Sequence, residues 1–192
     1  MNAARRAKAI LFDPAAAWMD IKEESGDPAF VLSQYVAWLA LVPAVFGFIG
    51  ASVIGEVTSG GGIAHASIFN GLFGAIFGYV MTCGSVLVLG LVIDLVAPLF
   101  GGRRDFDSAF KLSVYSFTPV WLVGIFLLLP GLRFLTLAGF YGAYILWLGL
   151  PRLLQPRPRR TLDFTALIVI AAFALVYLTA TAQRLVFGTP GL

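Results

Sequence analysis

The sequence contains little charge and few side chains suited to catalysis. Only 12% of its 192 residues are charged, whereas soluble domains average about 25%. It contains one cysteine, Cys83, and one histidine, His65. A single cysteine excludes an intrachain disulfide, and Cys83 lies in an apolar run where we expect it to pack as a small filler.

The scarcity of reactive groups argues against an enzyme. The sequence has no Ser-His-Asp set, no CxxC or HExxH motif and no phosphate-binding loop. His65 shares a Gly-rich stretch, residues 55–67, with Glu56, but two candidate ligands are too few for a metal site. We therefore expect no catalytic residues, no metal and no cofactor, and we expect this stretch to be a solvated loop.

Apolar residues, in contrast, are abundant. They make up 59% of the chain, and the mean hydropathy is +0.91. A soluble core of this size does not bury so much apolar surface, so the expected solvent is lipid. The net charge is +3, and the arginines flank apolar runs. The expected charged partners are therefore anionic lipid headgroups rather than nucleic acid.

Residues 111–151 contain two apolar runs of about 20 residues, each long enough to cross a bilayer as a helix. Pro130 and Gly131 separate the runs and predict a sharp reversal, which makes a transmembrane hairpin. The whole sequence predicts an all-α polytopic membrane protein with five transmembrane helices. The predicted spans are residues 31–54, 68–97, 111–129, 132–150 and 164–187, within a bundle formed by residues 28–192.

Two spans contain an internal proline. Pro43 is expected to kink the first span, because proline lacks an N–H and crowds the preceding turn. Pro119 cannot donate to the carbonyl of Tyr115, so that oxygen needs another partner.

Residues 1–27 form an amphipathic N-terminal segment. Asp13 and Pro14 are a typical helix start, and Trp18 and Ile21 recur at helical spacing on one side. Two arrangements are equally compatible with this pattern. The predicted short helix lies on the membrane surface, or it is a solvated helix that packs on the bundle.

The basic residues predict the orientation. Of the 13 Lys and Arg residues, 11 precede the first span or lie between spans 2 and 3 or spans 4 and 5, and 2 lie on the other side. Because cytoplasmic loops carry the excess, we expect a multi-pass inner-membrane protein with a cytoplasmic N-terminus and a periplasmic C-terminus. The arginines expected to contact anionic headgroups are Arg103, Arg104, Arg157, Arg159 and Arg160.

Small residues line one side of the second span at spacings of 3, 4, 4 and 3 residues. They are Gly71, Gly74, Gly78, Thr82 and Ser85. Such a seam allows another helix to approach closely. Gly90 lies about 140° from the seam, so we expect it to tolerate a larger side chain better.

The hairpin carries a family resemblance. The segments AFKLSVYSFTPVWL and PGLRFLTLAGFYGAYILWLGLPRLL resemble the C-terminal half of the Yip family, the Ypt/Rab-interacting proteins. The matching positions are Tyr115, Ser116, Thr118, Pro119, Gly139, Tyr141, Tyr144, Gly149 and Leu150. The resemblance implies five spans with a cytoplasmic N-terminus and, in eukaryotic members, roles in vesicle traffic and Rab GTPase binding. This chain lacks their long soluble N-terminal region, and its composition indicates a bacterial member.

Asp94 is the only acidic residue placed inside an apolar span. We expect it to accept a hydrogen bond within a polar, cytoplasm-facing pocket, because an ionisable residue in a span is a functional candidate. The candidate pocket residues are Asp94, Tyr115, Ser116, Thr118, Pro119 and Tyr144. In the alternative explanation, Asp94 lies near the cytoplasmic boundary and pairs with Arg103 or Arg104.

Two functions remain open from the sequence. The first is a non-enzymatic membrane-organising or partner-recruiting protein of the Yip type, with a protein partner or a second copy of the chain. The second is a small transporter or channel-like protein that uses the polar cavity.

Overall fold

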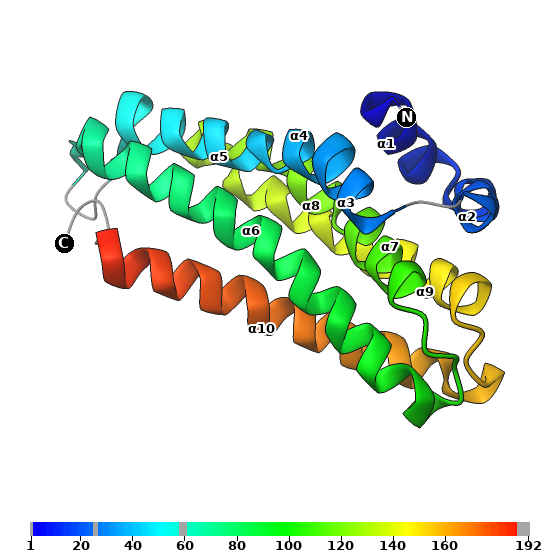
Figure 1. Ribbon diagram of the computed structural model, residues 1–192. Helices are drawn as coiled ribbons and strands as arrows, with labels where there is room; N and C mark the ends of the chain where they lie inside the picture. Colours follow the sequence, from blue (N-terminus) through cyan, green and yellow to red (C-terminus); the bar gives the residue numbers. More distant parts are fainter. Residues whose placement is uncertain (1, 25–26, 58–60, 188–192) are drawn as a thin grey trace.

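The computed structural model describes residues 2–24, 27–57 and 61–187 as an elongated bundle of helices (Figure 1). Within that part of the chain, five helical segments are long and apolar enough to cross a membrane. They are Pro28–Ile54, Ile68–Phe100, Phe106–Leu128, Pro130–Leu153 and Pro158–Phe187. The predicted all-α polytopic fold is therefore confirmed, and the structure extends most spans by a few residues.

The first span is interrupted, as its proline predicts. It consists of α3 (Pro28–Val31), η1 (Leu32–Val36), α4 (Ala37–Leu39), α5 (Leu41–Phe48) and η2 (Ile49–Ile54). The break at Ala40 lies three residues before Pro43, where the proline ring crowds the preceding turn. Gly124 in the third span makes room for this turn, since a Cβ there would lie 2.7 Å from Pro43 Cβ.

The second and fifth spans are the long regular helices. The second is α6 (Ile68–Val96), extended by the 3₁₀ turn η3 (Ala97–Phe100). The fifth is η6 (Pro158–Arg160) followed by α10 (Thr161–Phe187), which runs beside α6 (Figure 1). Between the first two spans the sequence predicted only a loop, but β1 (Glu56–Val57) pairs there with β2 (Ile63–Ala64) as an antiparallel ladder.

The third and fourth spans form the predicted hairpin. The first arm is α7 (Phe106–Ser116), α8 (Thr118–Leu122) and the 3₁₀ helix η4 (Val123–Leu128). The second is the 3₁₀ helix η5 (Pro130–Phe140) and α9 (Tyr141–Leu153). Only Leu129 separates the arms, so the reversal is as short as the sequence predicts.

The N-terminal segment forms two helices where the sequence predicted one. They are α1 (Ala3–Phe12) and α2 (Pro14–Glu23), which lie across one end of the bundle (Figure 1). Asp13 caps α2 by accepting from the Ala16 N–H at 3.1 Å, and Pro14 is the first helical residue. We call this end of the bundle the capped end and the opposite end the open end.

The apolar core is concentrated toward the capped end. Its largest fully buried side chains include Trp18, Tyr35, Leu89, Ile93, Phe110, Leu112, Tyr115, Ile145 and Phe164. In contrast, α5 and η5, in the open half, contain no buried residue. The bundle is therefore densely packed beneath α1 and α2 and loosely packed beyond the middle.

Candidate functional site

Trp18 fastens α2 to the bundle. Its side chain is fully buried, and its Nε1 donates to the carbonyl of Ile145 in α9 at 3.0 Å. Its ring also meets Tyr115 edge-on, with 6.0 Å between the centroids. The structure therefore has α2 packed on the bundle, with Trp18 buried between α2 and the helices beneath it. Whether the exposed side of α2 also touches the membrane surface stays a prediction.

Gly149 in α9 makes the room that Trp18 needs. A Cβ at this position would lie 2.6 Å from both Trp18 Cε2 and Leu112 Cδ2. On the same side, Lys111 of α7 is buried and donates from Nζ to the carbonyl of Ile21 at 3.3 Å and to that of Glu24. A cation at these carbonyls stabilises the C-terminal end of α2. This role cannot be read from the sequence, where Lys111 is one of the basic residues between spans 2 and 3.

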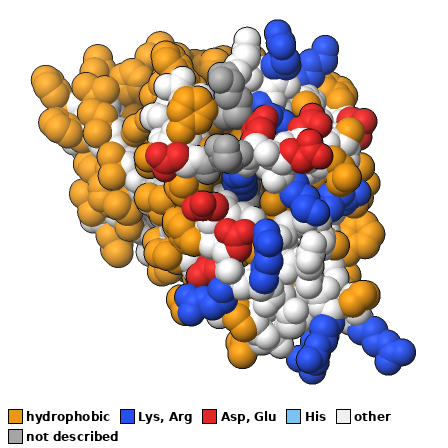
Figure 2. Space-filling view, turned by 45° about the vertical axis from the view of Figure 1, so that its right-hand side comes forward, with side chains coloured by type: hydrophobic (Ala, Val, Ile, Leu, Met, Phe, Trp, Pro, Cys, Tyr) orange, Lys and Arg blue, Asp and Glu red, His pale blue; other side chains and the backbone are white. Residues whose placement is uncertain are grey.

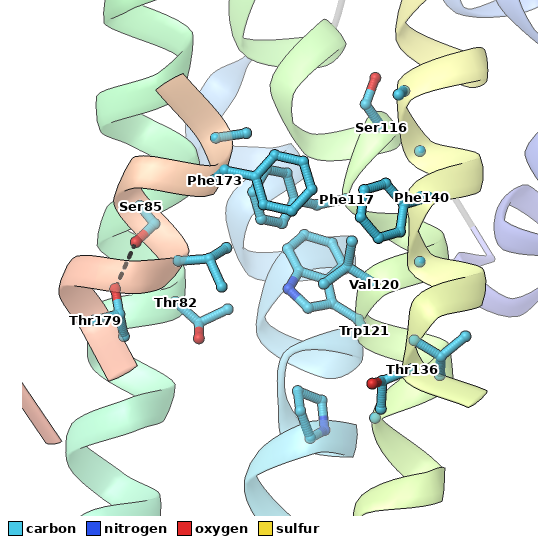
Figure 3. Close-up of a pocket in the computed structure, with 18 of the residues that line it drawn as sticks. Thr82, Ser85, Ser116, Phe117, Val120, Trp121, Thr136, Phe140, Phe173 and Thr179 are labelled. Carbon is cyan, nitrogen blue, oxygen red and sulfur yellow. Dashed lines mark hydrogen bonds between the residues drawn. The ribbon is translucent and has the colours of Figure 1, made fainter. Parts of the chain in front are cut away.

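The candidate pocket residues of span 3 are divided among three environments. Tyr115 packs against Tyr35 with 4.9 Å between the ring centroids, and Thr118 shares a hydrogen bond of 2.8 Å with the Tyr35 hydroxyl. Pro119 is buried in the first turn of α8. Ser116 instead lies at the edge of a cavity between the helices, which it helps to line (Figure 3).

Asp94 does not meet these hydroxyls. Its Oδ2 accepts from Arg104 Nη2 at 3.1 Å and from Nε at 3.4 Å. Its Oδ1 is buried without a partner among the described residues. Tyr144 lies elsewhere, half-exposed in an aromatic row with Tyr141 and Trp147. The predicted convergence on one polar pocket is therefore wrong, and the ion pair is the alternative that the sequence allowed.

The two arginine-rich loops form one surface at the capped end. The Arg103 N–H donates to the Leu154 carbonyl, and the Arg157 N–H donates to the Phe100 carbonyl, both at 3.0 Å. Arg160 adds a side-chain bond to the Leu99 carbonyl at 3.1 Å. We call this joined surface the arginine platform.

Local geometry makes the platform possible. Gly101 has φ +78°, and a Cβ there would lie 2.7 Å from Arg157 Cγ, so glycine is needed to close the two loops together. Asp105 caps α7 and pairs with Arg103 at 2.9 Å. Burial alone raises the pKa of Asp105, but hydrogen bonds from the Ser108 hydroxyl and N–H, together with Arg103, hold it below the ordinary value.

All five arginines expected to contact lipid are exposed at this end. Figure 2 shows basic and acidic side chains gathered there, with hydrophobic side chains covering most of the remaining view. Two of the five are engaged in ion pairs, Arg104 with Asp94 and Arg103 with Asp105. Contact of these arginines with anionic headgroups stays a prediction.

The small-residue seam of α6 faces two neighbouring elements. A Cβ at Gly71 would overlap the Ser52 hydroxyl of η2. A Cβ at Gly78 would lie 2.5 Å from Gln183 Nε2 of α10, and that amide donates to the Gly74 carbonyl at 2.7 Å. The glycines thus lie where α6 meets η2 and α10.

The rest of the seam continues along α10. Ser85 and Thr179 hydroxyls lie 3.4 Å apart, and Thr82 lines the cavity nearby (Figure 3). The expectation for Gly90 is wrong, however. A Cβ at Gly90 would lie 3.1 Å from the Phe110 Cα, because α7 packs against the other side of α6.

The cavity has a volume of about 500 Å³ and lies between α6, the hairpin and α10 (Figure 3). Its lining is mainly apolar and contains no charged side chain. No cluster of three or more His, Cys, Asp or Glu side chains that could hold a metal occurs within residues 2–24, 27–57 and 61–187. Apart from Ser116, the candidate pocket residues of the sequence do not line this cavity.

The sequence model of the Yip1 domain matches residues 8–181. The chain belongs to the Yip family. It is also similar to the inner membrane protein YohC of Escherichia coli K12, with 30% identity over 138 residues that cover 70% of this chain and 71% of YohC. YohC of E. coli strain CFT073 matches to the same extent. No solved structure matches the chain.

In this Yip-family chain, residues that carry the resemblance hold the N-terminal helices in place. Tyr115 and Gly149 contact Trp18, and the Tyr141 hydroxyl donates to the Leu11 carbonyl at the end of α1 at 2.9 Å. The sequence linked these positions only to family membership. Their shared contact with α1 and α2 becomes visible only when the distant segments are brought together.

Proposed function

We propose that this Yip-family chain is a non-enzymatic protein of the bacterial inner membrane that recruits partners at its cytoplasmic end. The observation that carries the proposal is the rigid construction of the capped end. Helices α1 and α2 are fixed by Trp18, and the two loops of the arginine platform are joined by backbone hydrogen bonds. A surface whose loops are already ordered loses less conformational entropy when it binds a partner.

The distribution of charge and the similarity to known proteins also support a non-enzymatic inner-membrane protein with the capped end in the cytoplasm. Eleven of the 13 basic residues lie at the capped end, which favours a cytoplasmic position for this end. The similarity to a protein named for the inner membrane supports the location. Family membership favours a non-enzymatic role, since it rests on small and aromatic residues that pack helices together.

The transporter alternative has less support. Its expected cavity was polar and open to the cytoplasm, whereas the cavity between the helices is mainly apolar. The densely packed residues beneath α2, including Phe110 and Ile145, lie between this cavity and the capped end. The cavity therefore has neither a polar opening toward the capped end nor an ionisable side chain that would bind a polar solute.

Site-specific photocrosslinking in native membranes tests the proposal. A photoreactive amino acid at exposed position 159 of the platform should give protein adducts, whereas one at exposed position 63 near the open end should give none. Arg157→Glu with Arg159→Glu should reduce the adducts several-fold. The matched control, Arg184→Glu at the exposed far end, should leave them unchanged. Absence of protein adducts at position 159, or equal adducts at both positions, would overturn partner recruitment by the platform.

A further inference from the structure

The cavity contains two polar groups that the protein leaves unpaired. Trp121 Nε1 and Ser116 Oγ are buried and have no hydrogen-bond partner within the described part of the chain. Trp121 is 1% exposed and Ser116 is 7% exposed, and both line the cavity. An unsatisfied buried polar group typically costs about 1–3 kcal/mol, so each of these groups favours a ligand that completes it.

The two groups define the chemistry of the ligand. An indole N–H is a donor only, so Trp121 requires an acceptor oxygen, and the Ser116 hydroxyl can also donate to one. The edge of the Trp121 ring that carries its nitrogen faces the side of the cavity with Thr82 and Ser85 (Figure 3). Because no charged residue lines the cavity, an ionised ligand would be buried without a counterion. The ligand is therefore neutral.

The cavity walls require a largely apolar body. Phe117, Phe140 and Phe173 surround its middle part (Figure 3). Such a lining, with a few placed polar groups and this volume, is typical of small-molecule sites. Aromatic rings also favour flat or chain-like apolar groups by stacking and contact.

The cavity opens toward lipid. Lining residues at its edge are exposed on the outside of the bundle, with Leu137 63% exposed, Phe140 55% and Phe173 48%. Ser116 and Trp121 lie near the middle of the span Phe106–Leu128. A phospholipid keeps its polar headgroup at the membrane surface, far from this depth, so its oxygens do not reach the two donors.

We propose that the cavity binds a neutral membrane lipid whose apolar body carries a hydrogen-bond-accepting oxygen. The lipid enters sideways from the hydrocarbon core past Leu137 and Phe140, and its oxygen accepts from Trp121 Nε1. Two kinds of lipid offer this chemistry, an isoprenoid quinone with ring carbonyls and a diglyceride with ester carbonyls. This inference goes beyond partner recruitment and does not depend on it.

Ligand binding to the purified full-length chain in detergent tests the inference. The probes are decylubiquinone for the quinone source, dioctanoylglycerol for the diglyceride source, and decylbenzene as an apolar molecule without oxygen. At least one of the two carbonyl lipids should raise Tm in a concentration-dependent way, because a ligand that binds only the folded state stabilises it. The one that acts identifies the source, and decylbenzene should bind about tenfold more weakly.

Variants separate recognition of the oxygen from general apolar binding. Trp121→Phe and Ser116→Ala each remove one polar group and are expected to weaken binding of the active lipid by about tenfold or less. Trp147→Phe and Ser33→Ala are matched controls outside the cavity and should bind as the wild type does. If Trp121→Phe does not fold, Ser116→Ala gives the same comparison.

Three results would overturn the inference. The first is that neither carbonyl lipid raises Tm. The second is that decylbenzene binds as tightly as the carbonyl lipids. The third is that both cavity variants bind the lipid with wild-type affinity. Displacement of the active lipid by phosphatidylethanolamine at equal concentration would also overturn it, since a phospholipid would then be the preferred occupant.

Discussion

Replacing Gly149 with alanine should detach α2 from the bundle. An ideal Cβ at position 149 would lie 2.6 Å from atoms of Trp18 and Leu112, a separation that real Cβ atoms do not show. Both side chains are fully buried, so neither has free space to move into. The indole must retreat, and this withdraws its Nε1 from the Ile145 carbonyl.

The expected magnitude follows from over-packing. Inserting one methyl group into a filled core typically costs about 1–3 kcal/mol. For a chain of this size, each kcal/mol lowers Tm by about 2–4 °C, so Gly149→Ala should lower it by about 2–12 °C. Gly84→Ala is the matched control, because nothing lies within 4 Å of its Cβ position and both glycines are in helices. The control gains only the helix propensity of alanine and should not be destabilised.

The assay combines melting with labelling. Thermal unfolding in detergent gives Tm, and a maleimide reagent reports on α2 through Ala17→Cys in a Cys83→Ala background. Ala17 is 2% exposed, so its cysteine should be protected in the parent chain and labelled when Gly149→Ala is added. Met19→Cys, at a site that is 54% exposed, should be labelled in both backgrounds.

A clear outcome would refute this reasoning. The reasoning fails if Gly149→Ala and Gly84→Ala have the same Tm and the cysteine at position 17 is still not labelled by maleimide. In that case the position of Trp18 does not depend on the space at position 149. The docking of α2 would have to rest on other contacts.

Four further predictions concern the rest of the chain. A C-terminal alkaline phosphatase fusion should be active and a fluorescent-protein fusion dark; the reverse would rule out a periplasmic C-terminus. Gly90→Leu should lower Tm more than Gly84→Leu, because α7 lies against Gly90; equal melting would contradict this packing. Arg104→Ala should cost about 1–3 kcal/mol by leaving the buried Asp94 carboxylate unpaired, whereas Asp94→Ala leaves a solvated arginine and should cost less; the opposite order in melting would refute it. Because the folded-state pKa of Asp105 is lowered, the stability it contributes is present above about pH 4 and is lost as pH falls through that lowered value. Asp105→Asn should make the fall in Tm below about pH 4 smaller. An unchanged fall would show that other carboxylates cause the loss of stability in acid.

The five spans could be predicted from sequence because each depends on its own residues. A run of about 20 apolar residues is long enough for a bilayer whatever its neighbours are. Pro130 marks the reversal by its own geometry, and Asp13 and Pro14 mark the start of α2. Such signals are local, so they remain readable without knowledge of the packing.

The contacts at the capped end could not be predicted in this way. Trp18 and Ile145 are 127 residues apart, and no local pattern in either segment predicts that they form a hydrogen bond. For Asp94 the sequence left two partners open, a hydroxyl of the candidate pocket or an arginine of the following loop, and the structure was needed to show that the partner is Arg104, ten residues away. Gly90 was judged by its angle from the seam alone, although a helix within a bundle contacts neighbours on several sides.

The long sequence separation between Trp18 and Ile145 also determines when α2 can dock during synthesis. The residues of α2 leave the ribosome long before α9, so the carbonyl that accepts from Trp18 does not yet exist when α2 is made. Lys111, which holds the other end of α2, arrives later as well. The N-terminal helices therefore reach their final position only after the fourth span has been inserted. Their protection from a protease would mark the moment at which the hairpin is complete.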